Sequence, residues 1–242
     1  MAQNKLQRFE AIKSFANVLQ YPENMPGRWK AFFKNEHPLT LELACGKGEY
    51  TLALSAMHPE RNIIGVDLKG NRIYVGAKEC LKQGLHNAAF LRIHIDKIDQ
   101  YFLPAEVSEI WITFPDPQLR TSRAKKRLTH PRFLRLYQKI LTHGGLVHLK
   151  TDSPVLFHFT RLVLDLYGVP INHFSEDVYA QTEIPAELAI KTHYEVLDIA
   201  RSKKIFYLSF TLPEEPLPVI DKALNELLKE IENPGARVPK YN

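Results

Sequence analysis

The sequence is poor in cysteine and contains no long apolar run. Cys45 and Cys80 are the only cysteines in 242 residues, and they do not form a CxxC pair, which excludes a disulfide framework. No apolar run approaches the roughly 20 residues of a membrane-spanning helix, and the first residues lack the apolar core and cleavage site of a secretory signal. We therefore expect a cytoplasmic protein with reduced thiols and no membrane segment.

Two classes of catalytic site are also missing from the sequence. The ten histidines show no HExxH motif and no Cys/His ligand spacing, so we expect no metal. A Ser-His-Asp hydrolase would need a Gly-x-Ser-x-Gly turn, and the sequence has none. Neither metal chemistry nor a serine nucleophile is supported.

Acidic residues are absent between Asp116 and Asp152, although the chain has 27 of them. The same stretch holds nine of the 32 basic residues, namely Arg120, Arg123, Lys125, Lys126, Arg127, Arg132, Arg135, Lys139 and Lys150. The net charge is +5, yet the other 23 basic residues are outnumbered by the acidic ones. A basic stretch that faces solvent suits a polyanionic partner, because each neutralised phosphate releases counterions. A solvated charge run without a ligand explains the pattern equally well.

Short apolar segments alternate with segments of helical length along most of the chain. The segments typical of buried strands are Leu39–Cys45, Ile63–Leu68, Ala89–Ile95, Glu109–Phe114 and Leu146–Lys150. Those typical of helices are Tyr50–Met57, Asn71–Gln83 and Arg132–Leu141, with Gly84 and Gly144-Gly145 as stops. Because strands separated by helices need crossover connections, this pattern predicts an α/β fold with a doubly wound, mostly parallel sheet.

The rest of the chain surrounds this alternating region. Ile205–Leu212 is a further strong strand, which we expect to run antiparallel, and Val219–Glu232 has the pattern of an amphipathic helix. We predict an amino-terminal helical extension over 1–38, rich in aromatic and basic residues, a main domain over 39–232 and a disordered tail over 233–242. The aromatic and basic residues of the extension are of the kind that stack on RNA, but core packing explains its aromatics better.

The first predicted strand runs into a Gly-x-Gly turn at Gly46-Lys47-Gly48. In a doubly wound sheet, ligands bind beyond the carboxyl ends of the strands, where the strand order reverses, and glycines let the backbone approach a ligand closely. Thr51 stands where a dinucleotide fold needs a third glycine, and Leu41 stands where a P-loop needs its first. A cofactor with a sugar but no pyrophosphate therefore fits this turn better.

A carboxylate follows the second predicted strand. Asp67 lies nineteen residues after Gly48, close to the spacing at which a carboxylate meets ribose hydroxyls in nucleotide-binding sheets. Taken alone, Asp67 is explained at least as well as a helix N-cap. Together with Glu42 and the glycine turn, it describes a site for a nucleoside that carries a positive charge instead of phosphates, which is the description of S-adenosylmethionine.

Asp116 follows the fourth predicted strand, between Pro115 and Pro117. The two prolines restrict the backbone on both sides and remove two N–H donors, so we expect a rigid carboxylate at the mouth of the sheet. The basic stretch begins four residues later, at Arg120. This order suits an enzyme that methylates a nucleic acid, and a proline-flanked turn with a capping aspartate is the structural alternative.

Four motifs, in this order, resemble the tRNA (guanine-N7-)-methyltransferase family. They are Leu41-Glu42-Leu43 with Gly46-Lys47-Gly48, Phe114-Pro115-Asp116-Pro117 followed by Lys125-Lys126-Arg127-Leu128-Thr129, His148-Leu149-Lys150-Thr151-Asp152, and Thr192-His193-Tyr194-Glu195. The resemblance extends from about Leu41 to Leu212. It implies the class I methyltransferase fold, a methyltransferase domain over 39–232, S-adenosylmethionine as the cofactor, and N7 of a guanine in the variable loop of tRNA as the methyl acceptor.

The resemblance also implies roles for single residues, with Asp116 as the catalytic one. The cofactor would be bound by Glu42, Gly46, Gly48, Asp67, His94 and Asp116. The substrate would be bound by Arg120, Asp152, Thr192, Tyr194 and Glu195. The chain departs from the family pattern at three positions: Gln118 replaces a tryptophan, Arg120 replaces a lysine, and His94 stands where an acidic or amide residue meets the adenine.

Spacing alone also allows structural interpretations. Thr192 and Glu195 have the spacing of a capping box, and Asp152 is placed to cap a helix that follows Ser153. Two other functions stay open from the residues: a methyltransferase for another nucleic-acid acceptor, such as an exocyclic amine, and a non-catalytic RNA-binding module. A monomer and a homodimer are both compatible with the sequence.

Overall fold

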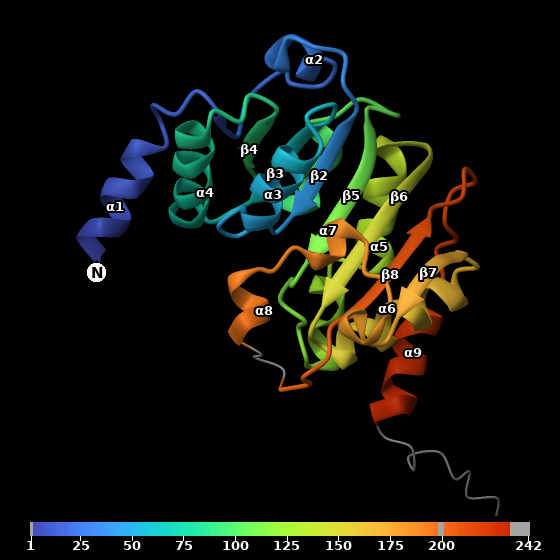
Figure 1. The fold of residues 1–242 in the computed structure, drawn as a ribbon. Coiled ribbons are helices and arrows are strands. Elements are labelled where there is room, and N and C mark those ends of the chain that lie inside the picture. The colour runs from blue at the N-terminus through green and yellow to red at the C-terminus, as the bar shows by residue number, and fades with distance from the viewer. Residues whose placement is uncertain (1, 198–200, 233–242) are drawn as a thin grey trace, which may run out of the picture.

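The chain folds around one eight-stranded sheet (Figure 1). In this computed structural model, which describes residues 2–197 and 201–232, the strands are β1 (Val18–Gln20), β2 (Leu39–Leu43), β3 (Asn62–Asp67), β4 (Ala88–Arg92), β5 (Val107–Thr113), β6 (Leu141–Thr151), β7 (Ile171–Ser175) and β8 (Phe206–Thr211). Their order is β1-β4-β3-β2-β5-β6-β8-β7. The pairs among β1 to β6 are parallel, whereas β8 is antiparallel to both β6 and β7.

Helices cover both faces of the sheet. They are α1 (Ala2–Ala11), α2 (Trp29–Phe33), α3 (Glu49–Met57), α4 (Gly70–Gln83), α5 (Pro131–Ile140), α6 (Pro154–Leu166), α7 (Ala186–Ala189), α8 (His193–Leu197) and α9 (Asp221–Glu232), with short 3-10 turns η1 (Ile95–Gln100), η2 (Thr121–Lys126) and η3 (Val178–Ala180). Leu41 of β2 joins a core with side chains of α2, α5, α6 and α9, while Trp111 of β5 packs with α3 and α7 on the other face. The predicted doubly wound, mostly parallel sheet is confirmed.

The strand order reverses between β2 and β5. The chain adds β3 and β4 on one side of β2, and it adds β6 beside β5 on the other. In parallel strands the carboxyl ends lie at one edge of the sheet, so the turns that follow β2 and β5 emerge side by side. This topology brings the Gly-x-Gly turn next to the segment that carries Asp116, as ligand sites in doubly wound folds require.

The amino-terminal residues are part of the same packed body. β1 pairs with β4 at one edge of the sheet, and α1 packs on α4. Trp29 is fully buried, its ring stacks on Phe102 at 5.2 Å between centroids, and its indole N–H donates to the carbonyl of Tyr101. Core packing therefore explains Trp29, as the sequence favoured. The predicted tail over 233–242 lies outside the described residues.

Two local expectations are corrected by the structure. Gly84 ends α4 with a left-handed φ of 67°, as predicted, but α5 ends at Ile140 and passes directly into β6, which contains Gly144 and Gly145. Between Leu141 and Leu146 the register against β5 shifts, so these glycines serve an irregular strand instead of a helix end. At the start of α6 the cap is Ser153, whose hydroxyl accepts from the Leu156 amide, and not Asp152.

Some elements had no clear signal in the sequence. β1 has three residues, and the middle of the edge strand β7 is exposed at Asn172, His173 and Phe174. Short edge strands bury too little apolar surface to show the alternation that identifies longer strands. No helix within residues 2–197 or 201–232 is long and apolar enough to cross a membrane.

Candidate active site

A cavity of about 460 Å³ lies at the carboxyl edge of the sheet, where the strand order reverses. The turns that follow β2, β3, β5 and β6 border it, and Thr192 closes it from the segment before α8. It is lined by the carboxyl groups of Glu42, Glu49, Asp67, Asp116 and Asp152 and by the cationic groups of Lys69 and Arg72. This excess of acidic groups favours a ligand that carries positive charge.

Asp67 joins the ends of β2 and β3. One of its carboxylate oxygens accepts from the Gly46 amide at 2.9 Å, and the other accepts from the Lys69 amide at 2.7 Å. The N-cap position of α4 belongs to Lys69, so the capping alternative for Asp67 does not describe its position. Asp67 instead holds the glycine turn against β3 and presents its remaining lone pairs to the cavity.

Glu42 is buried beneath this turn, with 2% of its surface exposed. One carboxyl oxygen accepts from the amide and the hydroxyl of Thr51, and the other accepts from the hydroxyl of Thr113 at 2.7 Å. Burial raises the pKa of Glu42 to about 7, against the opposing effect of these hydrogen bonds. Glu42 therefore ties the first turn of α3 to the end of β5, and it borders the cavity from below.

Gly48 is required by packing. Its φ of 72° lies in the left-handed region, and a Cβ there would approach the ring of Phe90 to 2.4 Å. Gly48 is thus the N-cap residue that lets α3 pack against β4, and it does not line the cavity. Gly46 does line it, through the backbone that donates to Asp67.

Asp116 stands on an exposed turn at the mouth of the cavity. One carboxylate oxygen accepts from the Gln118 amide at 3.0 Å, and Gln118 has a positive φ of 47°. Leu119, which is 66% exposed, lines the cavity beside it. The turn thus displays one carboxylate and one apolar side chain toward the same opening.

A segment from α7 to α8 borders the cavity at one residue. Thr192 lines the cavity, and its hydroxyl accepts from the Glu195 amide at 3.3 Å, as half of a capping box does. Lys150 is fully buried, and its ammonium donates to the carbonyls of Leu188 and Ile190 and to the Glu195 carboxylate. Burial lowers the pKa of Lys150, and Glu195 opposes that shift. Lys150 therefore links the α7–α8 segment to β6.

The structure brings together most, but not all, of the predicted site residues. Glu42, Gly46, Asp67, Asp116, Asp152 and Thr192 line one cavity. Four others do not line it. Gly48 lies in the glycine turn, and the Glu195 carboxylate bonds to Lys150. His94 and Arg120 are exposed at the starts of η1 and η2. The Tyr194 side chain lies outside the described part of the chain.

The basic stretch is only partly a solvent-facing surface. Lys150 and Arg127 are buried. Three further side chains form ion pairs, namely Arg132 with Asp96, Arg135 with Asp221 and Lys139 with Asp99. The remaining four, Arg120, Arg123, Lys125 and Lys126, lie exposed around η2. The interpretation as a basic stretch that faces solvent is thus correct only in part, because two of the nine cations are buried and three form ion pairs.

Sequence reasoning missed a buried polar network beneath α3 and α7. The His148 imidazole lies over the Trp111 ring at 4.0 Å, contacts the Tyr207 hydroxyl at 2.8 Å and lies 2.9 Å from Glu109. Arg61 also pairs with Glu109 at 2.9 Å. The signal was the alternation of Val147-His148-Leu149-Lys150, because polar residues at every second position of a buried strand must find partners on one face.

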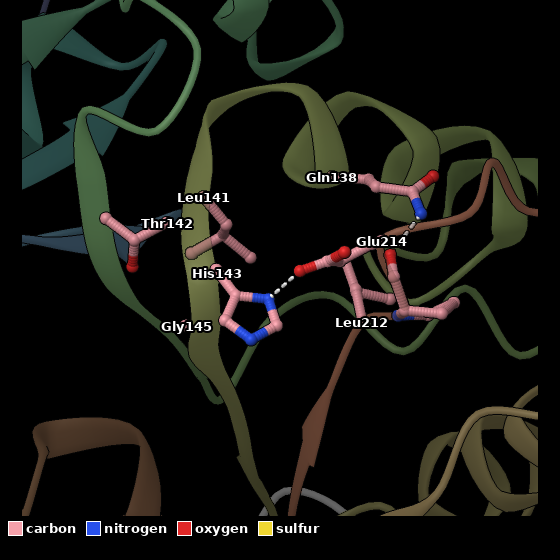
Figure 2. A pocket seen from close by; sticks show the side chains of 8 residues that line it. Gln138, Leu141, Thr142, His143, Gly145, Leu212 and Glu214 are labelled. Carbon is pink, nitrogen blue, oxygen red and sulfur yellow. Dashed lines mark hydrogen bonds and ion pairs between the residues drawn. The ribbon is translucent and has the colours of Figure 1, made fainter.

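A second, smaller cavity of about 190 Å³ lies at the opposite edge of the sheet, where β6 begins and β8 ends (Figure 2). His143 and Glu214 form an ion pair across it, and Gln138 lies beside them. None of the predicted site residues lines this cavity. Within residues 2–197 and 201–232, no group of three side chains is arranged to hold a metal ion.

Comparison with known proteins agrees with this arrangement. A family model described as "Putative methyltransferase" matches residues 36–208. The tRNA (guanine-N(7)-)-methyltransferase of Bacteroides fragilis is 44% identical over 224 residues, covering 89% of this chain and 88% of the relative. The protein of that name from Porphyromonas gingivalis is 46% identical, covering 84% of this chain and 87% of the relative. The chain belongs to the tRNA (guanine-N(7)-)-methyltransferase family. The resemblance seen in the four motifs is thereby confirmed.

Solved structures match the fold at low sequence identity. The 16S rRNA methyltransferase KamB superposes with a TM-score of 0.58 at 13% identity, covering 81% of this chain and 98% of that one. A 16S rRNA (adenine(1408)-N(1))-methyltransferase from Catenulisporales acidiphilia, crystallised with its cosubstrate SAM, superposes with a TM-score of 0.53 at 13% identity, covering 82% of this chain and 96% of that one. These likenesses confirm the class I methyltransferase fold.

Proposed function

We propose that this chain transfers a methyl group from S-adenosylmethionine to N7 of a guanine in the variable loop of tRNA. The observation that carries the proposal is that Gly46 and Asp67, on the nucleoside side, border the same cavity as Asp116, on the acceptor side. The names of the relatives support guanine N7 of tRNA as the acceptor. A tRNA substrate also agrees with the cytoplasmic location expected from the sequence.

The residues around the cavity fit S-adenosylmethionine. An ionised carboxylate has about four lone-pair sites, and Asp67 uses two of them on backbone amides, so it keeps acceptors for vicinal ribose hydroxyls. Five acidic side chains against two cationic ones suit a ligand with a sulfonium and an ammonium group. Bound here, the cofactor would supply an electrophilic methyl group. Glu42 would support the turn from beneath, through Thr51 and Thr113.

The acceptor chemistry requires no general base. Guanine N7 carries an in-plane lone pair that is unprotonated at neutral pH, so it can attack a methyl sulfonium without losing a proton first. The enzyme must place the two reactants in line, an effect of up to about 7–11 kcal/mol for well-oriented groups. It must also stabilise the positive charge that develops on the purine.

Asp116 is positioned for both tasks. One of its oxygens is used by the Gln118 amide, which leaves the other for the N–H donors on the edge of a guanine at the cavity mouth. The negative charge of the carboxylate would offset the charge that develops on the ring. Thr192 and Asp152, which line the same cavity, would contact the base or its ribose.

The exposed cations of η2 would bind the tRNA backbone. Arg120, Arg123, Lys125 and Lys126 follow Leu119 at the cavity mouth, and charge neutralisation of phosphates is the largest sequence-independent part of nucleic-acid affinity. Arginine at position 120 favours bidentate phosphate contact over the single-point contact of a lysine. Binding through these side chains should weaken steeply as the salt concentration rises.

Methylation of an unmodified tRNA transcript tests the proposal directly. The chain is incubated with labelled S-adenosylmethionine and tRNA, and the product is cleaved chemically at N7-methylguanine to map the modified base. A transcript made with 7-deazaguanosine keeps the other guanine edges but lacks the N7 acceptor, so it should accept no label. Label in the 7-deaza transcript, or binding of tRNA without any methyl transfer, would contradict the proposal.

A further inference from the structure

We propose that Arg127 is a positioning residue for methyl transfer, because its buried guanidinium holds the turn that carries Asp116 and Leu119. The inference rests on the proposed function and deepens it, since it names what fixes the acceptor side of the cavity. Arg127 does not line the cavity. It therefore acts through the backbone of the turn and not through contact with either reactant.

Arg127 is 3% exposed and donates to three successive carbonyls of the turn. Its Nε bonds to the carbonyl oxygen of Pro117 at 3.1 Å and contacts that of Gln118 at 3.3 Å. Its Nη2 bonds to Gln118 at 3.0 Å and contacts Leu119 at 3.3 Å. The guanidinium carbon lies 4.4 Å from the centroid of the Phe159 ring on α6. Arg127 thus links the turn to a core helix.

Burial of the Arg127 guanidinium is unfavourable unless the charge finds partners, and the turn provides them. A buried cation is expensive unless it is well paired, and Arg127 forms no ion pair with a carboxylate of residues 2–197 or 201–232. Its partners are main-chain oxygens instead, and burial lowers its pKa. The structure therefore places a permanent charge in the protein interior to satisfy one short stretch of backbone.

The turn needs this support because it has few other internal bonds. Pro115 and Pro117 have no amide hydrogen to donate, and Gln118 is held at a positive φ of 47°, which is unfavourable for a residue with a side chain. The Asp116 carboxylate is bonded to the Gln118 amide of the same turn, so this bond does not tie it to the core. The position of Asp116 consequently follows the position of the Pro117–Leu119 carbonyls.

Only an arginine matches this geometry. The planar guanidinium presents Nε–H and an Nη2–H along one edge, which is what adjacent carbonyls require, whereas a lysine ammonium offers a single point of contact. Arg127→Lys keeps the charge and loses the fork. A misplacement of about 1 Å in a reacting group can lower a rate by roughly 100-fold, so we expect this change to lower kcat by about 10–100-fold.

The test compares steady-state kinetics of the wild type, Arg127→Lys and a matched control, Arg135→Lys. Arg135 lies in the same basic stretch, but its partners are Asp221 and the Pro218 carbonyl. Neither partner belongs to the turn. We expect Arg127→Lys to lose kcat while its Kd for S-adenosylmethionine stays within about twofold, because Gly46 and Asp67 are untouched. Arg135→Lys should lower the melting temperature and leave kcat within about twofold.

A double-mutant cycle with Asp116→Ala separates positioning from a general loss of structure. If Arg127 acts through Asp116, Arg127→Lys adds no further loss of kcat in the Asp116→Ala background. Equal losses in both backgrounds, or a wild-type kcat for Arg127→Lys, would overturn the inference. Phe159→Leu removes the ring beneath the guanidinium and should show an intermediate loss of kcat. This variant provides the test if Arg127→Lys does not fold. Failure of the proposed function is distinguishable, because the wild type itself would then form no N7-methylguanine.

Discussion

The buried carboxyl of Glu42 should make the stability of the ligand-free protein depend on pH. Its pKa is raised from 4.5 to about 7 by burial, so between these values the folded protein retains a proton that the unfolded chain has lost. For an acid with a raised pKa, stability is highest below the unfolded pKa and falls as pH rises toward the folded pKa. We therefore expect Glu42 to destabilise the protein progressively from about pH 4.5 to pH 7.

The size of this effect follows from the shift. A difference of about 2.5 pKa units corresponds to about 3 kcal/mol, at about 1.4 kcal/mol per unit. For a chain of this length, about 3 kcal/mol moves the melting temperature by roughly 6–12 °C. Glu42→Gln removes the charge and retains polar atoms toward Thr51 and Thr113, so most of this pH dependence should disappear in the variant.

The assay is thermal or urea unfolding of the wild type and Glu42→Gln between pH 5 and pH 8, without ligand. Glu226→Gln, an exposed position on α9, controls for the loss of one acidic group at the surface. The difference between the free energies of unfolding of wild type and Glu42→Gln should change by about 2.5 kcal/mol from pH 5 to pH 8, because part of the effect already lies below pH 5. Parallel curves across this range would refute the reasoning.

Three other changes give distinct outcomes. Asp116→Ala should lower kcat for tRNA methylation by about 100-fold or more with an unchanged melting temperature, because the side chain is exposed; retained turnover in a methyl-transfer assay would remove Asp116 from the mechanism. Asp67→Ala should weaken S-adenosylmethionine binding at least about 10-fold in calorimetry and leave tRNA affinity within about twofold, and an unchanged cofactor Kd would contradict the proposed role. Lys150→Met removes the cationic partner of the Glu195 carboxylate and should cost about 3–5 kcal/mol in urea unfolding. Adding Glu195→Gln should recover part of that loss, and no recovery would show that the ion pair is not its source.

The sequence alone was sufficient for the fold, and six of the residues that it predicted for the site line one cavity. The alternating segments from Leu39 to Lys150 predict the parallel sheet because buried strands and crossover helices differ in length and in apolar content. The glycine turn, Asp67 and the proline-flanked Asp116 mark the carboxyl ends of three strands. These signals are local, because each depends on residues that are adjacent in the sequence. Contacts made by single side chains had no such signal. The spacing of Thr192 and Glu195 predicts a cap, but it says nothing about Lys150, which lies forty-two residues before Thr192.

Tertiary structure decided which charged side chains face solvent and which are buried in contacts that support the fold. All nine cations between Asp116 and Asp152 look alike in the sequence, yet Arg127 and Lys150 are buried on backbone carbonyls while Arg123 and Lys126 face solvent. The same holds for carboxylates, since Glu42 is enclosed by Thr51 and Thr113 and Asp116 is exposed. Residue type determines the charge that a side chain can carry, whereas only the packing of distant segments determines its solvation, and solvation decides whether that charge binds a ligand or supports the fold.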